Sequence, residues 1–563
     1  MILFALAAAA SAITLPPPNP YLSQGAPAVT HNDSGASDAM PVKGPREQGP
    51  VAPTRIQRIA TGLLTINYAG LLRYPGGVQA TWNTNNNRVT KIRIDNGHWE
   101  ELAALPIEGM TLLSAAQVNA HLAAFDQAAS EAELRSYLAR ALPFYAETQA
   151  REAGIYSMTD ERGQFYVLTR SAILVYGQAD DRDPRSAVVL LRKWTIPASL
   201  KRDEAARALL LTRLERSGQG ANAELRRGIG LMRDMPLGIN MTYDGHIVFS
   251  MVGGSVVVID REFRNVPQVV TVPGELFTNS LSVDPDGGIY AVGDRRMHKF
   301  VWHRGKLSDR QRDGAWSSPY DLTESSLPGV RGGGTGSGTT ATLLGFGPGE
   351  DRLVVIADGQ QRMNIVAFWR DAIPRDARRQ PGTASRRIAG QMAVTMGGIT
   401  DPYIQTEASI GVAGPYAFVL NGMAPQNIKP DLDNLLVQGP FRTPPRGVEM
   451  FRWDHARNRW DSLWARADVS TPAAIIPVLS TVSRQAYVMA WDSEGWNVTG
   501  LDFDSGKTET RMVLGRSQQF NGAWGVLQLL PDGDVFIPGI AGPVRVARQR
   551  DGAALGEVRE QKR

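Results

Sequence analysis

The chain has 563 residues, of which 43% are hydrophobic and 21% charged, a composition that supports a large core and excludes a mostly disordered protein. Glycine (57 residues) and proline (35) are frequent, which favours many short strands joined by turns over a helical bundle. The net charge of +4 is small and no dense Lys/Arg block occurs, so no nucleic-acid partner is expected. Cysteine is absent, which excludes disulfides, thiolate metal sites and iron–sulfur clusters.

The first residues of the chain resemble an export signal. Residues 1–12 are an apolar run that ends in Ala10-Ser11-Ala12, a small-x-small pattern typical of a signal-peptidase site. The run is too short to span a bilayer, and no other segment has ~18 consecutive apolar residues, so no transmembrane span is expected. We therefore predict a signal peptide at residues 1–12 and a periplasmic or secreted protein.

Both ends of the remaining chain are expected to lack fixed structure. Residues 13–55 contain Pro16-Pro17-Pro18 and then a polar stretch without periodicity, which predicts a disordered, proline-rich linker. Residues 549–563 are charged and poor in apolar residues, which predicts a flexible tail.

One pattern recurs between these ends: a short apolar strand, a tight turn, and a second strand rich in β-branched or aromatic residues. Asp-Gly at three of the turns supplies the positive φ that tight hairpins need. The seven copies span residues 160–167, 243–249, 282–292, 349–355, 413–419, 483–489 and 531–537. Such a repeat predicts a single β-propeller domain over residues 56–548. A β-sandwich with extra domains is the alternative.

The number of copies favours seven blades, with six or eight as alternatives. Residues 77–94 also have the composition of strands, and two roles are open for them. They either complete the last blade, so that the two chain ends close the ring, or form an eighth blade.

Two helical insertions are predicted, at about residues 114–150 and 201–228. The first contains two capping-box sequences, at residues 114–117 and 130–133, and a leucine stripe at helical spacing. In the second, apolar residues repeat every four positions from Ala206 to Leu214. These helices are placed to pack on the propeller or to cover one of its mouths.

The repeat also indicates which residues reach the central channel. Counting seven residues back from each turn reaches the far end of the innermost strand, at ~3.3 Å per residue. On three consecutive blades this count gives Asn279, Thr342 and Glu407, whose oxygens suit a Ca²⁺ or Mg²⁺ site. The loops between second and third strands return to the same mouth and carry Asp358 and Asp492, which we expect to serve acid–base chemistry together with Glu407.

Residues 278–287 resemble the N-G-x-x-x-D-x-x-G strand of the gluconolactonase and strictosidine-synthase-like propellers, with Ser280 in place of the family's glycine. The resemblance covers about ten residues. It implies that Asn279 is a ligand of a divalent cation, which polarises a lactone or ester carbonyl for hydrolysis. Glu407 is assigned to the same site by blade counting alone.

The sequence thus favours an exported, divalent-cation-dependent hydrolase of a small ester or lactone, with a small polar molecule or an envelope component as its partner. No haem is expected. A non-catalytic binding or scaffold propeller is the first alternative, and a quinoprotein-like oxidoreductase is the second.

Overall fold

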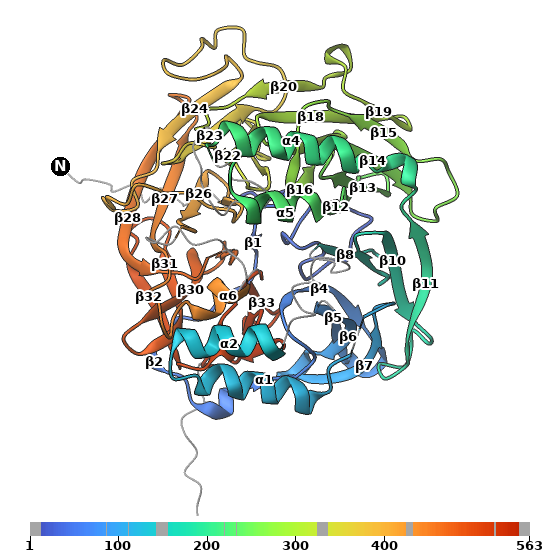
Figure 1. Cartoon of the computed structure of the whole chain (residues 1–563), viewed down its shortest axis with the longest axis vertical. Helices are drawn as coiled ribbons and strands as arrows, with labels where there is room; N and C mark the ends of the chain where they lie inside the picture. The colour runs from blue at the N-terminus through green and yellow to red at the C-terminus, as the bar shows by residue number, and fades with distance from the viewer. Residues whose placement is uncertain are drawn as a thin grey trace, which may run out of the picture.

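Short, mainly antiparallel strands are the main regular structure in a computed structural model, which describes residues 13–550 except 86, 111, 142–155, 219, 232, 324–335, 424–431, 474 and 523–524. The strands form eight separate sheets arranged in a ring (Figure 1). The predicted all-β propeller with helical insertions is therefore confirmed. Residues 1–12, the predicted signal peptide, and most of the predicted tail lie outside the described residues.

We number the blades in chain order and give the strands of each from the innermost outward. Blade 1 consists of β4 (Thr65–Arg73), β5 (Gln79–Asn85), β6 (Arg88–Arg93) and β7 (Glu100–Pro106), and blade 2 of β8 (Ser157–Thr159), β9 (Phe165–Leu168), β10 (Ala172–Gln178) and β11 (Val188–Thr195). Blade 3 consists of β12 (Pro236–Met241), β13 (His246–Met251), β14 (Ser255–Asp260) and β15 (Gln268–Thr271). Blade 4 consists of β16 (Phe277–Val283), β17 (Gly288–Gly293) and β18 (Arg296–His303), with β19 (Lys306–Ser308) and β20 (Trp316–Pro319) both paired with β18.

Blades 5 to 8 follow the same order. They are β21 (Thr342–Leu344), β22 (Leu353–Ala357), β23 (Asn364–Trp369), β24 (Ile388–Ala393); β25 (Gly411–Ala413), β26 (Tyr416–Leu420), β27 (Arg446–Asp454), β28 (Arg459–Ser470); β1 (Ala39–Met40), β29 (Val478–Ser480), β30 (Gln485–Asp492), β31 (Gly495–Asp502), β32 (Thr508–Gly515), β2 (Gln48–Pro50); and β33 (Gln528–Leu529), β34 (Val535–Ile537), β35 (Val544–Val546), β3 (Ile56–Arg58).

The seven repeats lie in seven different sheets, blades 2 to 8, each at the turn between the first two strands of the repeat. Residues 77–94 belong to the remaining sheet, blade 1, so they take the second of the two roles predicted for them, part of an additional blade. The ring therefore contains eight sheets, the alternative to the preferred number of seven. The ring is closed instead by β3, which pairs antiparallel with β35 at the outer edge of blade 8.

An aspartate at the start of a turn explains why two of these hairpins form. Asp284 Oδ1 accepts hydrogen bonds from the backbone N–H groups of Asp286 (3.0 Å) and Gly288 (2.8 Å), and its Oδ2 accepts from the Tyr290 hydroxyl (2.7 Å). Asp160 makes the same set of contacts in blade 2. Gly287 has φ of +84°, which a side chain would strain. The carboxylate thus fixes the turn and ties it to the strand that follows.

The hydrophobic core lies between neighbouring sheets. Trp82 of blade 1, for example, stacks on Phe165 of blade 2 with ring centroids 5.8 Å apart, and both side chains are buried. Such layers repeat around the ring, so each blade buries apolar side chains on both faces.

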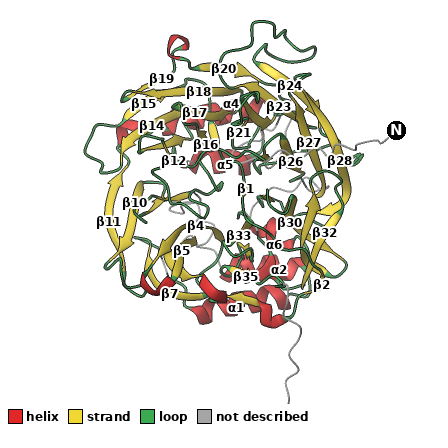
Figure 2. Cartoon of the chain, turned by 180° about the vertical axis from the view of Figure 1, so that it is seen from behind, coloured by secondary structure: helices red, strands yellow, loops and turns green. Residues whose placement is uncertain are grey.

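The helices gather on one face of the ring (Figure 1). They are α1 (Ala115–Gln127), α2 (Glu131–Ala141), α4 (Asp203–Arg216), α5 (Ala223–Leu231) and α6 (Leu432–Val437), with short 3₁₀ helices at Pro53–Arg55, Pro75–Gly77, Asp95–Gly97, Ala198–Leu200, Gln311–Asp313 and Gln518–Phe520. Because strands alternate in direction, connections between blades leave the sheet opposite the turns that join first and second strands. We call these two sides the helix face and the turn face; Figure 2 gives the view from the turn face.

A buried ion pair fastens α4 to the helix face. Arg213 Nε lies 2.8 Å from Asp294 Oδ2, and both side chains are buried. A second guanidinium nitrogen of Arg213 donates to the carbonyl oxygen of Gly274 (2.9 Å). No helix in the described part of the chain is both long enough and apolar enough to cross a membrane.

The expectation of a disordered linker at residues 13–55 is wrong. This segment enters the ring, and β1 lies near its centre in both views (Figures 1 and 2). Nearly all residues from Ala28 to Met40 are buried, and β1 and β2 pair in parallel with β29 and β32. The segment lacks periodicity because it contacts a different blade every few residues rather than one sheet along its length.

Candidate functional site

Residues 27–40, which we call the axial segment, occupy the centre of the ring and bond to every blade. Carbonyl oxygens of the segment accept from seven backbone N–H groups over 2.6–3.1 Å; the donors are Gly70, Thr159, Val283, Leu343, Val412, Leu479 and Thr481. Blade 3 adds the Asn240 side chain, which donates to Ser34 O (3.1 Å), and blade 8 adds Gln528, which donates to Asn32 Oδ1 (3.0 Å). The channel is therefore filled by the chain itself.

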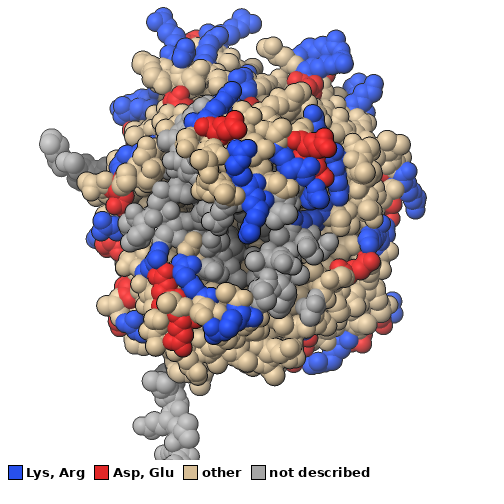
Figure 3. All heavy atoms as spheres, in the orientation of Figure 1, with Lys and Arg blue, Asp and Glu red and all other residues tan. Residues whose placement is uncertain are grey.

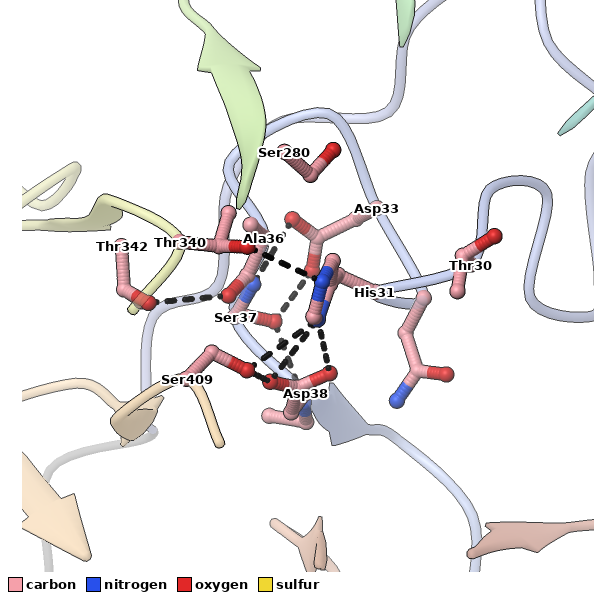
Figure 4. Close-up of polar contacts among 12 residues, drawn as sticks. Thr30, His31, Asp33, Ala36, Ser37, Asp38, Ser280, Thr340, Thr342 and Ser409 are labelled. Atoms are coloured by element: carbon pink, nitrogen blue, oxygen red, sulfur yellow. Dashed lines mark hydrogen bonds and ion pairs between the residues drawn. The ribbon is translucent and has the colours of Figure 1, made fainter. Parts of the chain in front are cut away.

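A buried polar network surrounds His31 of the axial segment (Figure 4). His31 Nδ1 lies 3.2 Å from Asp38 Oδ1, and His31 Nε2 lies 3.1 Å from the Thr340 hydroxyl. Ser409 donates to Asp38 and lies 3.1 Å from His31 Nδ1. All four side chains are at most 4% exposed. A carboxylate on Nδ1 and a hydroxyl on Nε2 fix the orientation of the imidazole ring.

The network continues towards the helix-face mouth of the channel through Asn279. Asn279 Oδ1 accepts from the hydroxyl groups of Thr340 (3.0 Å) and Tyr156. Its Nδ2 donates to the carbonyl oxygens of Gly338 (2.5 Å) and Glu407 (3.3 Å). Asn279 and Glu407 are half-buried, in contrast to the residues around His31. The structure thus brings together two of the residues selected by blade counting, from blade 4 and from the residues leading into blade 6.

The predicted cation ligands already have protein partners. Asn279 Oδ1 accepts from three donors, the third being the backbone N–H of Ser280 (2.8 Å). Thr342 is buried, and its hydroxyl donates to Ala36 O (3.2 Å) of the axial segment. A Ca²⁺ or Mg²⁺ ion would have to displace these hydrogen bonds, so the arrangement does not fit the expected ligand set. Across the described ranges, no three His, Asp or Glu side chains are grouped to hold a metal ion.

Asp358 and Asp492 stabilise their own turns. Asp358 Oδ1 accepts from the backbone N–H groups of Gln360 (3.1 Å) and Asn364 (2.9 Å), and burial raises the pKa of Asp358 to about 7. Asp492 is 2.7 Å from Arg511 in an ion pair and also accepts from the backbone N–H of Glu494 (2.9 Å). None of these contacts involves Asn279 or Glu407.

Sequence reasoning missed the four residues of the buried network. Thr340 and Ser409 each lie two positions from a residue that was selected, Thr342 and Glu407, and alternate residues of a strand share a face. A two-residue shift of the count finds each of them, but in opposite directions: towards the N-terminus for Thr340 and towards the C-terminus for Ser409. His31 and Asp38 had no such signal, because they belong to a segment without a repeat.

Charged side chains are mixed over the helix face. Figure 3 shows Lys and Arg groups beside Asp and Glu groups around the ring. This mixture agrees with the net charge of +4 and gives the face no extended area of one sign.

Comparison with known proteins relates the chain to propellers in general and to one protein of unassigned activity. No protein-family model matches. A protein of Archaeoglobus fulgidus, named "Uncharacterized protein", is 31% identical over 325 residues, which cover 55% of this chain and 60% of that protein. The chain thus spans about three-fifths of the length of this curated relative.

Similar solved structures have low sequence identity to this chain. A putative 6-phosphogluconolactonase from Bacteroides fragilis is 12% identical, with 81% of this chain and 96% of that chain covered and a TM-score of 0.39. The designed protein Ika8 is 8% identical, with coverages of 87% and 98% and a TM-score of 0.42. The propeller fold expected from the resemblance is present, and the particular superfamily stays a prediction.

Proposed function

We propose that the protein hydrolyses a small ester or lactone at the helix-face mouth of the channel. One observation supports this most: the half-buried Asn279 donates to the backbone carbonyl oxygen of the half-buried Glu407, which comes from another blade, and Thr340 links Asn279 to the buried His31–Asp38 pair. Partly exposed polar groups held by a buried hydrogen-bond network are typical of catalytic sites.

In this proposal Glu407 is the general base that takes a proton from the attacking water. Asn279 is a positioning residue next to it: its Nδ2 donates to the backbone carbonyl oxygen of Glu407, while Thr340 and Tyr156 donate to its Oδ1 and fix the orientation of the amide. His31 and Asp38 in turn hold the Thr340 hydroxyl. A rigid support of this kind lowers the cost of orienting the groups that act on the substrate.

The test is a panel of small esters and lactones with purified full-length protein. Glu407→Gln should lower kcat by ~100-fold or more, the usual contribution of a general base. Glu509→Gln, at an exposed position on the outer strand β32, is the matched control and should leave kcat unchanged. Unchanged turnover in the Glu407 variant would refute the proposed role.

Dependence on Ca²⁺ or Mg²⁺ is tested by chelation in the same assay. Because the oxygens of Asn279 and Thr342 are already hydrogen-bonded, we expect turnover to survive the chelator. Loss of turnover that Ca²⁺ or Mg²⁺ restores would instead support the cation site predicted from the resemblance.

Two outcomes would favour the alternatives. Saturable binding of a small polar molecule or an envelope component without turnover would indicate a non-catalytic propeller, to which a channel filled by its own chain is well suited. A visible chromophore in the purified protein would indicate a quinoprotein-like oxidoreductase. Periplasmic or secreted localisation is part of the proposal, and cleavage after Ala12, read by N-terminal sequencing of exported protein, would support it.

A further inference from the structure

A cavity of about 700 Å³ lies on the turn face, away from the site proposed above. Apart from Thr481 and Pro531, every residue that lines it comes from residues 13–42. Its walls are mainly apolar and include Leu15, Leu22 and Met40. This volume is within the range of sites that enclose a small organic molecule, ~300–1,000 Å³.

A smaller, basic hollow of about 380 Å³ adjoins this cavity. The two share Pro41, Val42 and Pro531 as lining residues. The smaller hollow adds three cationic side chains and one acidic residue, namely Lys43, Arg548, Arg550 and Asp532.

Among the described residues, the positive charges of the basic hollow are only partly balanced, and Arg548 Nε donates to a neutral acceptor, the carbonyl oxygen of Asp532 (2.9 Å). Asp532 Oδ2 is held by the buried Arg545 (2.6 Å) and by Arg550 (3.2 Å). Lys43 is exposed and Arg548 half-buried, and within the described residues neither has a carboxylate partner. Two cations therefore face solvent at the edge of an apolar cavity.

The geometry points to a binding site for a small amphipathic anion, whose apolar body fills the cavity and whose carboxylate, sulfonate or phosphate group contacts Lys43 and Arg548. Asp33 supports this orientation, because it lines the cavity but not the basic hollow. Its carboxylate already accepts from the backbone N–H of Gly35 (2.8 Å) and from Ser37. Burial raises the pKa of Asp33 to about 7, so the ionised fraction of this carboxyl repels an anionic group, which the cations of the basic hollow attract.

Ligand binding at this site would also stabilise the folded ring. The cavity walls belong to the same N-terminal stretch whose residues 27–40 bond to all eight blades. A ligand that binds only the folded state raises the melting temperature as its concentration exceeds Kd.

The test uses 8-anilinonaphthalene-1-sulfonate, an apolar fluorophore with a sulfonate, and decanoate as competitor, both with the native full-length chain. We expect saturable, blue-shifted fluorescence, displacement by decanoate, and a melting temperature that rises with decanoate. Decyltrimethylammonium, which has the same tail and the opposite charge, should displace the fluorophore at least ~10-fold less well, because charge-assisted contacts are lost.

Substitutions distinguish the charged contacts of Lys43 and Arg548 from the apolar contacts of the cavity. Lys43→Gln combined with Arg548→Gln should weaken decanoate binding at least ~10-fold. Arg46→Gln, a nearby exposed arginine that pairs with Glu509 (3.1 Å), is the matched control and should bind as the native protein does. Leu15→Trp should weaken both probes by filling the cavity, with its melting temperature measured without ligand as the check on folding.

The proposal is overturned if the fluorophore does not bind, if the double variant binds decanoate as tightly as the native chain, or if the cationic detergent competes equally well. These results are independent of the ester and lactone panel, because the two sites lie on opposite faces.

Discussion

Deleting residues 13–40, which include the axial segment, should destabilise the ring by an amount that the hydrogen bonds allow us to calculate. Removal of residues 13–40 takes away the acceptors of seven backbone N–H groups on the innermost strands of six blades. At a net ~0.5–1.5 kcal/mol for each bond, the loss is ~4–10 kcal/mol. This is comparable with the whole stability of an ordinary domain, ~5–15 kcal/mol.

The assay is thermal unfolding of the truncated protein beside the full-length chain. An unfolding entropy of ~2.1 cal/mol/K per residue gives ~1 kcal/mol/K for this ring, so the melting temperature should fall by ~4–9 °C. Hydrogen exchange should become faster at Val283, Leu343 and Val412, whose N–H groups lose their acceptors. A synthetic peptide of residues 13–40, added in trans, should restore both properties.

A truncated protein that melts within ~1 °C of the full chain, with unchanged exchange at these three amides, would refute the reasoning. It would show that water entering the emptied channel replaces the segment without loss. Failure of the peptide to rescue a destabilised truncation would instead limit the role of the segment to folding.

Three further predictions concern single side chains. Burial raises the pKa of Asp358 to about 7, above its usual value of 3.8, so between these two pH values the folded state binds a proton that the unfolded state has lost. The melting temperature should therefore fall as pH rises from 4 through 7. Asp358→Asn should flatten this dependence. Arg213→Ala leaves a buried carboxylate without its partner and should cost ~3–5 kcal/mol, measured by urea unfolding, whereas replacing both partners by leucine should cost less. Gly287→Ala should destabilise more than Gly274→Ala in the same assay, since both glycines have positive φ but only the first would press a Cβ onto the Trp302 carbonyl oxygen. Equal effects of the two glycine substitutions would count against this contact.

The blades were predictable because each begins with a local signal. Asp284 followed by Gly287 specifies its turn within a few residues, and Tyr290 completes the contact on the next strand. Blade 1 lacks this signal: its first two strands are joined at residues 74–78 by a turn with Gly76 and Gly77 at positive φ. Only β5 and β6 were therefore predicted as strands, and their role in the ring was left open.

The axial segment was not predictable from local pattern. Ser34 bonds to Val283 and Asp38 to Leu479, partners that lie hundreds of residues away. A segment that uses single backbone contacts to many strands needs no hydrophobic alternation, so its composition resembles that of a linker. The prolines that precede it, Pro16-Pro17-Pro18, which favoured disorder in the sequence, line the cavity on the turn face.

The candidate site was predictable in part. Counting back from the turns located Asn279 and Glu407 at one mouth, because each lies seven residues before the turn that joins the first two strands of its blade. Asp358 and Asp492 were selected from the loops between second and third strands, and their acid–base role stays a prediction; in the structure each accepts hydrogen bonds from the backbone of its own turn. His31 could not be found by counting, because it belongs to the axial segment, which contains no repeat.

The position of the axial segment also constrains how the protein reaches its native state. During synthesis the segment emerges long before the strands that surround it, and its bond to Leu479 must wait for more than four hundred residues. Contacts of such long range slow folding and leave intermediates exposed. Blades formed early cannot close on one another until the last sheet, completed by β3, is available. We therefore expect slow, chaperone-assisted maturation in which the central residues are enclosed rather than threaded into a finished ring.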